Sequence, residues 1–213
     1  MDSAWIARLL VPARCPVCRG GLEPDGLICG ACIRAMNGCR VLREDPPEGI
    51  DRIASCADHD GVPREILTAF KFGRLTGLSG LIAGFMADAA GPATASAILV
   101  PVPPARLRTW LRGFDPVGML AAGVSARTGV RSADEPTLTR RGSGRQRGRG
   151  RAGRISDPPD IRPCGEAAKV LGGREVILVD DVMTTGATLS AAAAALRQSG
   201  ATSISALTFT RRL

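Results

Sequence analysis

Two adjacent carboxylates followed by a run of small polar residues stand out near the C-terminus. Asp180 and Asp181 follow the apolar run 176–179, and Thr184, Thr185, Gly186, Ala187 and Thr188 come shortly after them. Gly186 permits a sharp turn, so that backbone N–H groups and threonine hydroxyls can converge on one anion at the start of a helix. Carboxylates repel phosphate, but they hold vicinal hydroxyls and Mg2+. The pattern therefore predicts a site for a ribose 5-phosphate with Mg2+.

Other nucleotide-binding loops fit this sequence less well. The chain has no G-x-x-x-x-G-K-[ST] loop, and no G-x-G-x-x-G directly follows a strand pattern. The remaining alternative is a polar turn at a strand end that binds no ligand.

Four cysteines near the N-terminus form two C-x2-C pairs, Cys15 with Cys18 and Cys29 with Cys32, separated by ten residues. Each pair can put two thiolates on one tetrahedral ion, and the spacing allows a hairpin that brings the pairs together. No histidine or open ligand position accompanies them, so we expect a structural Zn2+ rather than a catalytic one. The alternative is a set of structural or redox thiols, and Cys39 is an alternative ligand.

The hydrophobic periodicity of the sequence predicts the strands and helices that must position these residues. Residues 176–179 and 203–209 read as strands, with a helix over 189–199 between them. Upstream, strands are expected at 52–57 and 98–102, and helices at 62–72, at 78–90 and from the Asp115 N-cap to about 127. Alternating strands and helices favour a parallel α/β sheet with helices on both faces, which binds ligands at its carboxyl edge. His59, between Asp58 and Asp60, is expected in a surface turn.

Charge and composition restrict the kinds of partner that this chain can bind. The net charge is +8 and the basic residues are almost all arginine, which suits phosphate recognition. Aromatic residues make up only 3% of the chain, which argues against a base-stacking platform for single strands. Neither a membrane-spanning stretch nor a secretory signal is evident, so we expect no membrane insertion and a cytoplasmic location.

Residues 140–163 are rich in arginine and glycine, and we expect them to form a mobile loop.

Residues 176–189 resemble the phosphoribosyl-pyrophosphate motif of type I phosphoribosyltransferases. The wider chain is similar to the ComF family of competence-associated phosphoribosyltransferase-like proteins. The matches are the two C-x2-C pairs, Phe70-Lys71-Phe72, Val100-Pro101-Val102-Pro103, Arg112-Gly113-Phe114 and residues 176–189. The resemblance implies a zinc knuckle at 1–45 and a type I phosphoribosyltransferase-like domain at 46–213.

The resemblance also implies roles for individual residues. Asp180 and Asp181 would be catalytic and would hold the ribose hydroxyls and Mg2+, and residues 184–188 would bind the 5-phosphate of phosphoribosyl pyrophosphate. The implied pyrophosphate-binding residues are Val102, Pro103, Arg106, Arg108 and Arg112. The implied lid over the pyrophosphate contains Arg140, Arg145, Gln146 and Arg147.

Two functions remain open on the sequence. The first is a phosphoribosyltransferase that displaces pyrophosphate from ribose C1 with an unknown base, associated with competence and DNA uptake. The second is a non-catalytic accessory protein that senses the ligand or binds nucleic acid, with single-stranded DNA or a competence protein as partner.

Overall fold

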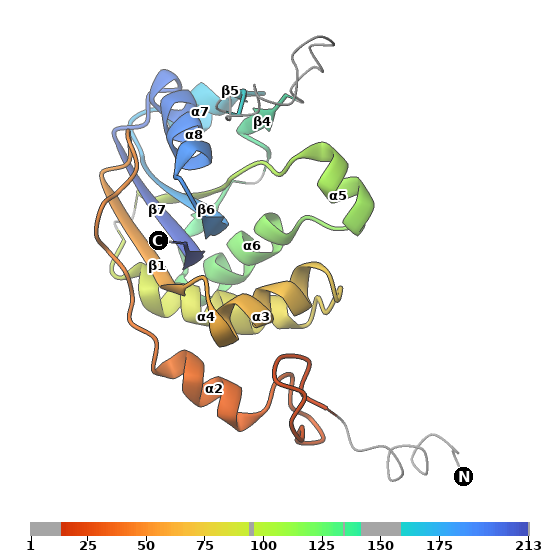
Figure 1. The fold of residues 1–213 in the computed structure, drawn as a ribbon. Coiled ribbons are helices and arrows are strands. Elements are labelled where there is room, and N and C mark those ends of the chain that lie inside the picture. The colour runs from red at the N-terminus through yellow and green to blue at the C-terminus, as the bar shows by residue number, and fades with distance from the viewer. Residues whose placement is uncertain (1–13, 94–95, 134, 142–158, 213) are drawn as a thin grey trace, which may run out of the picture.

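The computed structural model describes residues 14–93, 96–133, 135–141 and 159–212, apart from the side chains of residues 106–108. Its centre is a five-stranded parallel sheet (Figure 1). The strand order is β1 (Arg52–Asp58), β7 (Ser203–Arg211), β6 (Glu175–Met183), β2 (Ile98–Pro101) and β3 (Arg131–Ser132). All five strands run in one direction, so their carboxyl ends share one edge of the sheet.

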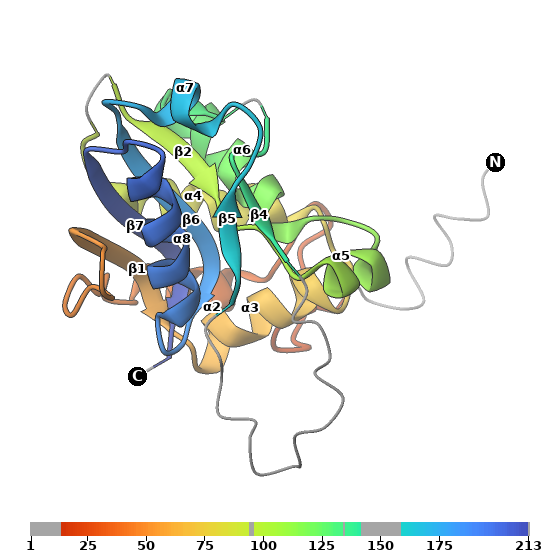
Figure 2. The same cartoon turned by 90° about the horizontal axis from the view of Figure 1, so that it is seen from above.

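Helices cover both faces of the sheet, as the sequence predicts. One face carries α3 (Gly61–Lys71), α4 (Leu78–Ala90) and α6 (Pro116–Thr128), and the other carries α7 (Ala167–Leu171) and α8 (Ala187–Gln198). A short antiparallel ribbon of β4 (Leu138–Arg140) and β5 (Ile161–Pro163) lies beside α8 (Figure 2). Among the described residues, no helix has both the length and the hydrophobicity that crossing a bilayer requires.

The buried strand β6 shows why its sequence is apolar without alternation. Ile177 and Val179 pack into the hydrophobic cluster on the α4 and α6 side, whereas Val176 and Leu178 pack into the cluster on the α8 side. A strand covered on both faces needs apolar residues at every position.

Local signals also explain the helix boundaries. The Asp115 side chain accepts a hydrogen bond of 3.0 Å from the Val117 N–H, and Pro116 takes the first position of α6. The helix stops at Gly129, whose φ of 72° is left-handed. The predicted start of this helix is confirmed.

Two expectations need correction. The acidic pair does not follow the strand but belongs to it, because β6 continues to Met183 and pairs there with β7. The expected loop at 140–163 does not reach residue 163, because Ile161 lies in β5. Ile161 is only 8% exposed and packs into the part of the core on the α8 side. Residues 142–158 lie outside the described residues.

Three of the four predicted cysteine ligands belong to the same core as the sheet, and Cys18 is exposed. After an isolated bridge between Arg14 and Gly21, the chain reaches α2 (Gly30–Asn37), which contacts α3. Cys15, Cys29, Cys32 and Met36 are buried in the hydrophobic cluster that also contains residues of α3 and α4. The cysteine segment therefore packs on one face of the larger domain.

Candidate functional site

The acidic pair lies at the carboxyl end of β6. Asp180 is 9% exposed, and its Oδ1 accepts a hydrogen bond of 2.8 Å from the Asp181 N–H. Burial, and then the negative charge of Asp181, raise the pKa of Asp180 to about 8. At neutral pH the Asp180 carboxyl is therefore largely protonated, and a cation bound there would displace its proton.

A lysine from another element reaches the same pair. Lys71 Nζ lies 2.6 Å from Asp181 Oδ2, and the two side chains are only 12% and 13% exposed. Lys71 is the last residue of α3, and its neighbour Phe70 is fully buried against Phe114 with ring centroids 5.6 Å apart. Sequence reasoning missed this contact. The sequence signal nearest to it is the Phe70-Lys71-Phe72 match.

Thr184, Thr185 and Gly186 form a loop, the Thr/Gly loop, that turns directly into α8. Gly186 has a φ of +77°, and a Cβ there would lie 2.6 Å from Pro47 Cγ, so both the turn and the close approach require glycine. No side chain caps the helix, and the Ala187 N–H makes only a 3.4 Å bond to Thr185 Oγ1. The N–H groups of the first turn of α8 are thus available to an anion.

Open space lies beside this loop. Thr185 and Ala187 line a pocket of about 660 Å3 together with Pro47, Ile161 and residues of α8 such as Ser190 and Ala194. Thr184 and Thr185 are exposed, and Thr188 is half-buried in α8. Hydroxyls and helix N–H groups therefore lie together in the loop that follows β6, and the pocket extends from this loop along α8.

The implied pyrophosphate residues occupy the neighbouring strand end. The Val102 N–H donates to the Val179 carbonyl at 2.9 Å, which places Val102 and Pro103 beside the end of β6. Residues 106–112 then form α5 (Arg106–Arg112), and the Arg106 and Arg108 side chains lie outside the described part. The Arg112 guanidinium stacks 5.0 Å from the centre of the Phe72 ring, next to Lys71 in the sequence.

Of the four residues implied to form the lid, Arg140 is the one that the structure describes. Arg140 is the last residue of β4 and is half-buried, and its charge is among those that lower the pKa of Asp180 against the larger effect of burial. Arg145, Gln146 and Arg147 lie outside the described residues.

The four predicted cysteines come together. Their sulfur atoms all lie within 4.8 Å of one another, with Cys15 and Cys32 at 3.9 Å and Cys18 and Cys29 at 3.4 Å. A tetrahedral site with metal–sulfur bonds of about 2.3 Å has edges of roughly 3.8 Å, so the cluster could hold one zinc ion. Cys39 is not a member, and its sulfur contacts the Ala35 carbonyl at 3.3 Å.

The surroundings of this cluster favour a thiolate at Cys15, whereas burial and hydrogen bonds with the neighbouring sulfur atoms raise the pKa of Cys32. Burial disfavours ionisation of Cys15, but hydrogen bonds from backbone N–H groups, including that of Cys29, outweigh it and lower the pKa of Cys15 to about 6.

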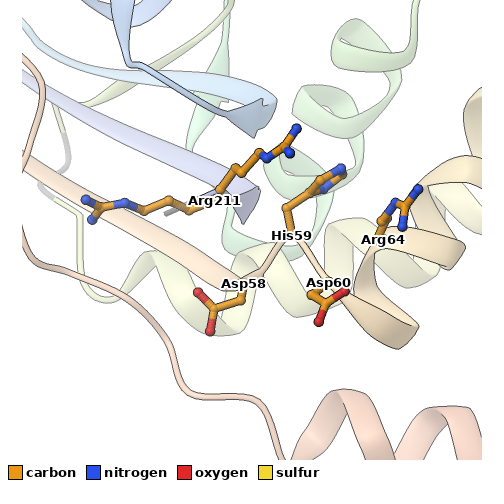
Figure 3. Close-up of a pocket in the computed structure, with 6 residues that line it drawn as sticks. Asp58, His59, Asp60, Arg64 and Arg211 are labelled. Atoms are coloured by element: carbon orange, nitrogen blue, oxygen red, sulfur yellow. The ribbon is translucent and has the colours of Figure 1, made fainter.

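A second pocket, of about 710 Å3, opens at the carboxyl ends of β1 and β7 (Figure 3). It is lined by Asp58, His59, Asp60, Arg64, Arg211 and Arg212. His59 lies in the turn between β1 and α3, as expected, but it is half-buried and its Nδ1 lies 2.9 Å from Thr210 Oγ1. No local sequence pattern indicates that this turn meets the end of β7.

A comparison with known protein families finds a match in the second half of the chain. Residues 129–213 match the family model of the phosphoribosyl transferase domain. The matched segment contains β6, the Thr/Gly loop, α8 and β7. Over residues 129–213 the chain is therefore similar to phosphoribosyl transferase domains. These residues supply β6 and β7 of the parallel sheet.

Two solved structures align with part of this chain. The allosteric regulatory enzyme of purine biosynthesis aligns with a TM-score of 0.41 and 22% identity over 61% of this chain and 25% of its own. This chain thus spans about a quarter of that enzyme. A purine phosphoribosyltransferase from Pyrococcus horikoshii Ot3 aligns with a TM-score of 0.34 and 20% identity over 64% of this chain and 72% of its own. No curated protein sequence matches the chain.

Proposed function

We propose that this protein binds phosphoribosyl pyrophosphate with Mg2+ and transfers the phosphoribosyl group to a nitrogen acceptor. The observation that carries the proposal is the joining of a buried acidic pair, Asp180 and Asp181, to an uncapped helix N-terminus through a glycine-containing turn. One end of such a site suits a phosphate, and the other suits a diol with a divalent cation.

Each part of the site has a distinct task in this proposal. The N–H groups at the start of α8 and the hydroxyls of Thr184, Thr185 and Thr188 hold the 5-phosphate. Asp180 and Asp181 accept hydrogen bonds from the ribose hydroxyls and would hold the Mg2+. When bound, Mg2+ stabilises negative charge that develops on the leaving pyrophosphate.

The strand end next to β6 completes the ligand site. Val102 and Pro103 lie where the pyrophosphate would pass β2, and Arg106, Arg108 and Arg112 follow in α5. Arginine forks bind such oxygens in pairs, which orients the leaving group as well as stabilising it. Arg140 and the three residues Arg145, Gln146 and Arg147 would cover the pyrophosphate as a lid.

We propose further that Cys15, Cys18, Cys29 and Cys32 bind one structural Zn2+. All four ligand positions of a tetrahedral ion are then filled by thiolates, so the ion has no open position for chemistry. Residues 1–45 would form this knuckle and residues 46–213 the transferase-type domain. Membership of the ComF family and a link to competence stay predictions.

A binding experiment tests the central proposal. Titration calorimetry with phosphoribosyl pyrophosphate should give saturable binding with Mg2+ and much weaker binding with EDTA. Asp180→Asn with Asp181→Asn should abolish the Mg2+-dependent part, whereas Asp25→Asn, at an exposed loop position, should not change it. Absence of binding at millimolar ligand contradicts the proposal. Binding with no pyrophosphate release for any base would favour the non-catalytic accessory role instead.

A further inference from the structure

The pocket at His59 is joined to the end of β6 by backbone hydrogen bonds. The His59 N–H donates to the Arg211 carbonyl at 2.6 Å, and the Arg212 N–H donates to the Met183 carbonyl at 2.8 Å. Met183 directly precedes the Thr/Gly loop. The order along the carboxyl edge is therefore the turn after β1, the end of β7, the acidic pair on β6, and Val102 on β2.

This order fixes where an acceptor must approach. A nucleophile that displaces pyrophosphate from ribose C1 attacks from the side opposite to the leaving group, and it must be held there before reaction. The proposed function puts the ribose at β6 and the pyrophosphate toward β2. The space on the other side of β6 is the end of β7 and β1, where the 710 Å3 pocket lies. That volume is within the usual range, about 300–1,000 Å3, of small-molecule sites.

The charges in this pocket are not evenly distributed. In Figure 3 the side chains of His59 and Arg64 point to one side of the turn, while the carboxylates of Asp58 and Asp60 point to the other. Arg211 is held elsewhere, since its Nη1 donates to the Glu44 carbonyl and its Nη2 lies 3.7 Å from Asp45.

Two arginines are left to face a ligand. Arg64 and Arg212 are exposed and line the pocket, and neither forms an ion pair within the described residues. Guanidinium groups that lack a carboxylate partner beside a half-buried imidazole suit an acceptor with an anionic substituent.

We propose that this pocket is the acceptor site and that it takes a nitrogen heterocycle carrying a carboxylate. Arg64 and Arg212 bind the carboxylate, and His59 hydrogen-bonds to the ring. The inference rests on the proposed function, and it adds the substrate class that the sequence left open.

The chemical step balances with the groups present. The lone pair of the ring nitrogen forms the bond to ribose C1, and the C1–O bond to pyrophosphate breaks with its electrons leaving on pyrophosphate. Where the ring nitrogen carries a hydrogen, neutral His59 takes that proton. Burial, and then the positive charge of Lys71, lower the pKa of His59. Arg64 and Arg212 act in the same direction, and Asp181 opposes them, so the imidazole is available as a base near neutral pH.

Matched pairs of probes test the proposal. Orotate with uracil, and nicotinate with nicotinamide, differ within each pair in the carboxylate. Each probe is titrated into the protein with Mg2+ and phosphoribosyl pyrophosphate, and binding and pyrophosphate release are recorded. We expect at least one carboxylated member to bind at least tenfold more tightly than its uncharged partner.

Variants then locate the site. Arg64→Gln and Arg212→Gln should each weaken binding of the carboxylated probe at least tenfold and leave the Kd of phosphoribosyl pyrophosphate unchanged. Arg127→Gln, on the far end of α6, is the control and should change neither. The inference is overturned if, in both pairs, the two members bind equally or not at all. It is also overturned if neither pocket variant changes binding of the carboxylated probe. In both cases binding of phosphoribosyl pyrophosphate still stands. Loss of phosphoribosyl pyrophosphate binding in the wild type would instead defeat the proposed function.

Discussion

Lys71 Nζ lies 2.6 Å from Asp181 Oδ2, so the end of α3 neutralises one of the two carboxylates at the end of β6. The ammonium group occupies an oxygen that the proposed function assigns to ribose or Mg2+. The contact joins residues 110 positions apart, and both side chains are largely shielded from solvent. A cation that enters the site must therefore compete with a cation that the protein supplies.

The first prediction follows from this competition. Lys71→Met should increase the affinity for Mg2+ in the absence of other ligands by about tenfold, since a charge contact worth about 1.4 kcal/mol corresponds to that factor. Calorimetric titration with Mg2+ measures this affinity. Lys169→Met is a matched control, because Lys169 is exposed and pairs with Glu166 on the surface. Unchanged or weaker Mg2+ binding in Lys71→Met would show that the lysine does not compete.

The second prediction concerns pH. Asp180 has a pKa of about 8 in the folded protein against an ordinary value of 3.8, so the folded state holds more protons between these values than the unfolded state. The contribution of this carboxyl to stability is complete below about pH 3.8 and is lost as the pH rises through about 8. Without Mg2+, the unfolding free energy of the wild type should fall between about pH 4 and 8 more steeply than that of Asp180→Asn. Denaturant unfolding across this range provides the measurement, and parallel curves would contradict the assignment.

The third prediction uses two glycines with similar backbone angles. Gly186 and Gly129 have φ values of +77° and +72°, but only at Gly186 would a Cβ meet another residue, Pro47 Cγ at 2.6 Å. Gly129→Ala should cost about 1 kcal/mol of stability from backbone strain alone. Gly186→Ala should cost roughly 1–3 kcal/mol more, because the added atom is overpacked.

The same pair separates stability from ligand binding. Gly186→Ala should also weaken binding of phosphoribosyl pyrophosphate, since Pro47 or the loop must move, whereas Gly129→Ala should leave it intact. Denaturant unfolding and calorimetry measure the two effects. Equal losses of stability in both variants would mean that Pro47 yields easily.

The fourth prediction concerns the cysteine cluster. Purified, reduced protein prepared without chelators should contain about one zinc per chain, and Cys18→Ser should lose most of it. A ligand loss should lower the Tm, because structural zinc contributes folding free energy directly. Cys164→Ser lies outside the cluster and should keep both the zinc and the Tm. Wild-type protein free of zinc by metal analysis would rule out the site.

Much of the architecture could be predicted because its signals are local. The apolar run of β6 indicated a strand covered on both faces, and Asp115 with Pro116 indicated a helix start, both of which the structure shows. The four cysteines were recognisable because metal ligands have fixed spacing. These features depend on neighbours within a few residues.

The parts that could not be predicted are contacts between distant segments. Nothing near Lys71 indicates that its side chain reaches Asp181, and nothing near Gly186 indicates that Pro47 covers it. The pocket at His59 likewise exists only because the turn after β1 meets the end of β7. Such neighbours are set by the order of strands in the sheet, which periodicity alone does not determine.

The ribbon of β4 and β5 has a consequence for how this protein can diverge. The Arg141 N–H donates to the Asp160 carbonyl at 2.9 Å, so the two ends of the intervening sequence are held one hydrogen bond apart. The entropy of closing a chain between fixed ends grows only logarithmically with its length, by about 0.6 kcal/mol for each doubling. Insertions and deletions between these anchors should therefore be tolerated during evolution, and orthologues can differ in length there while the sheet keeps its geometry.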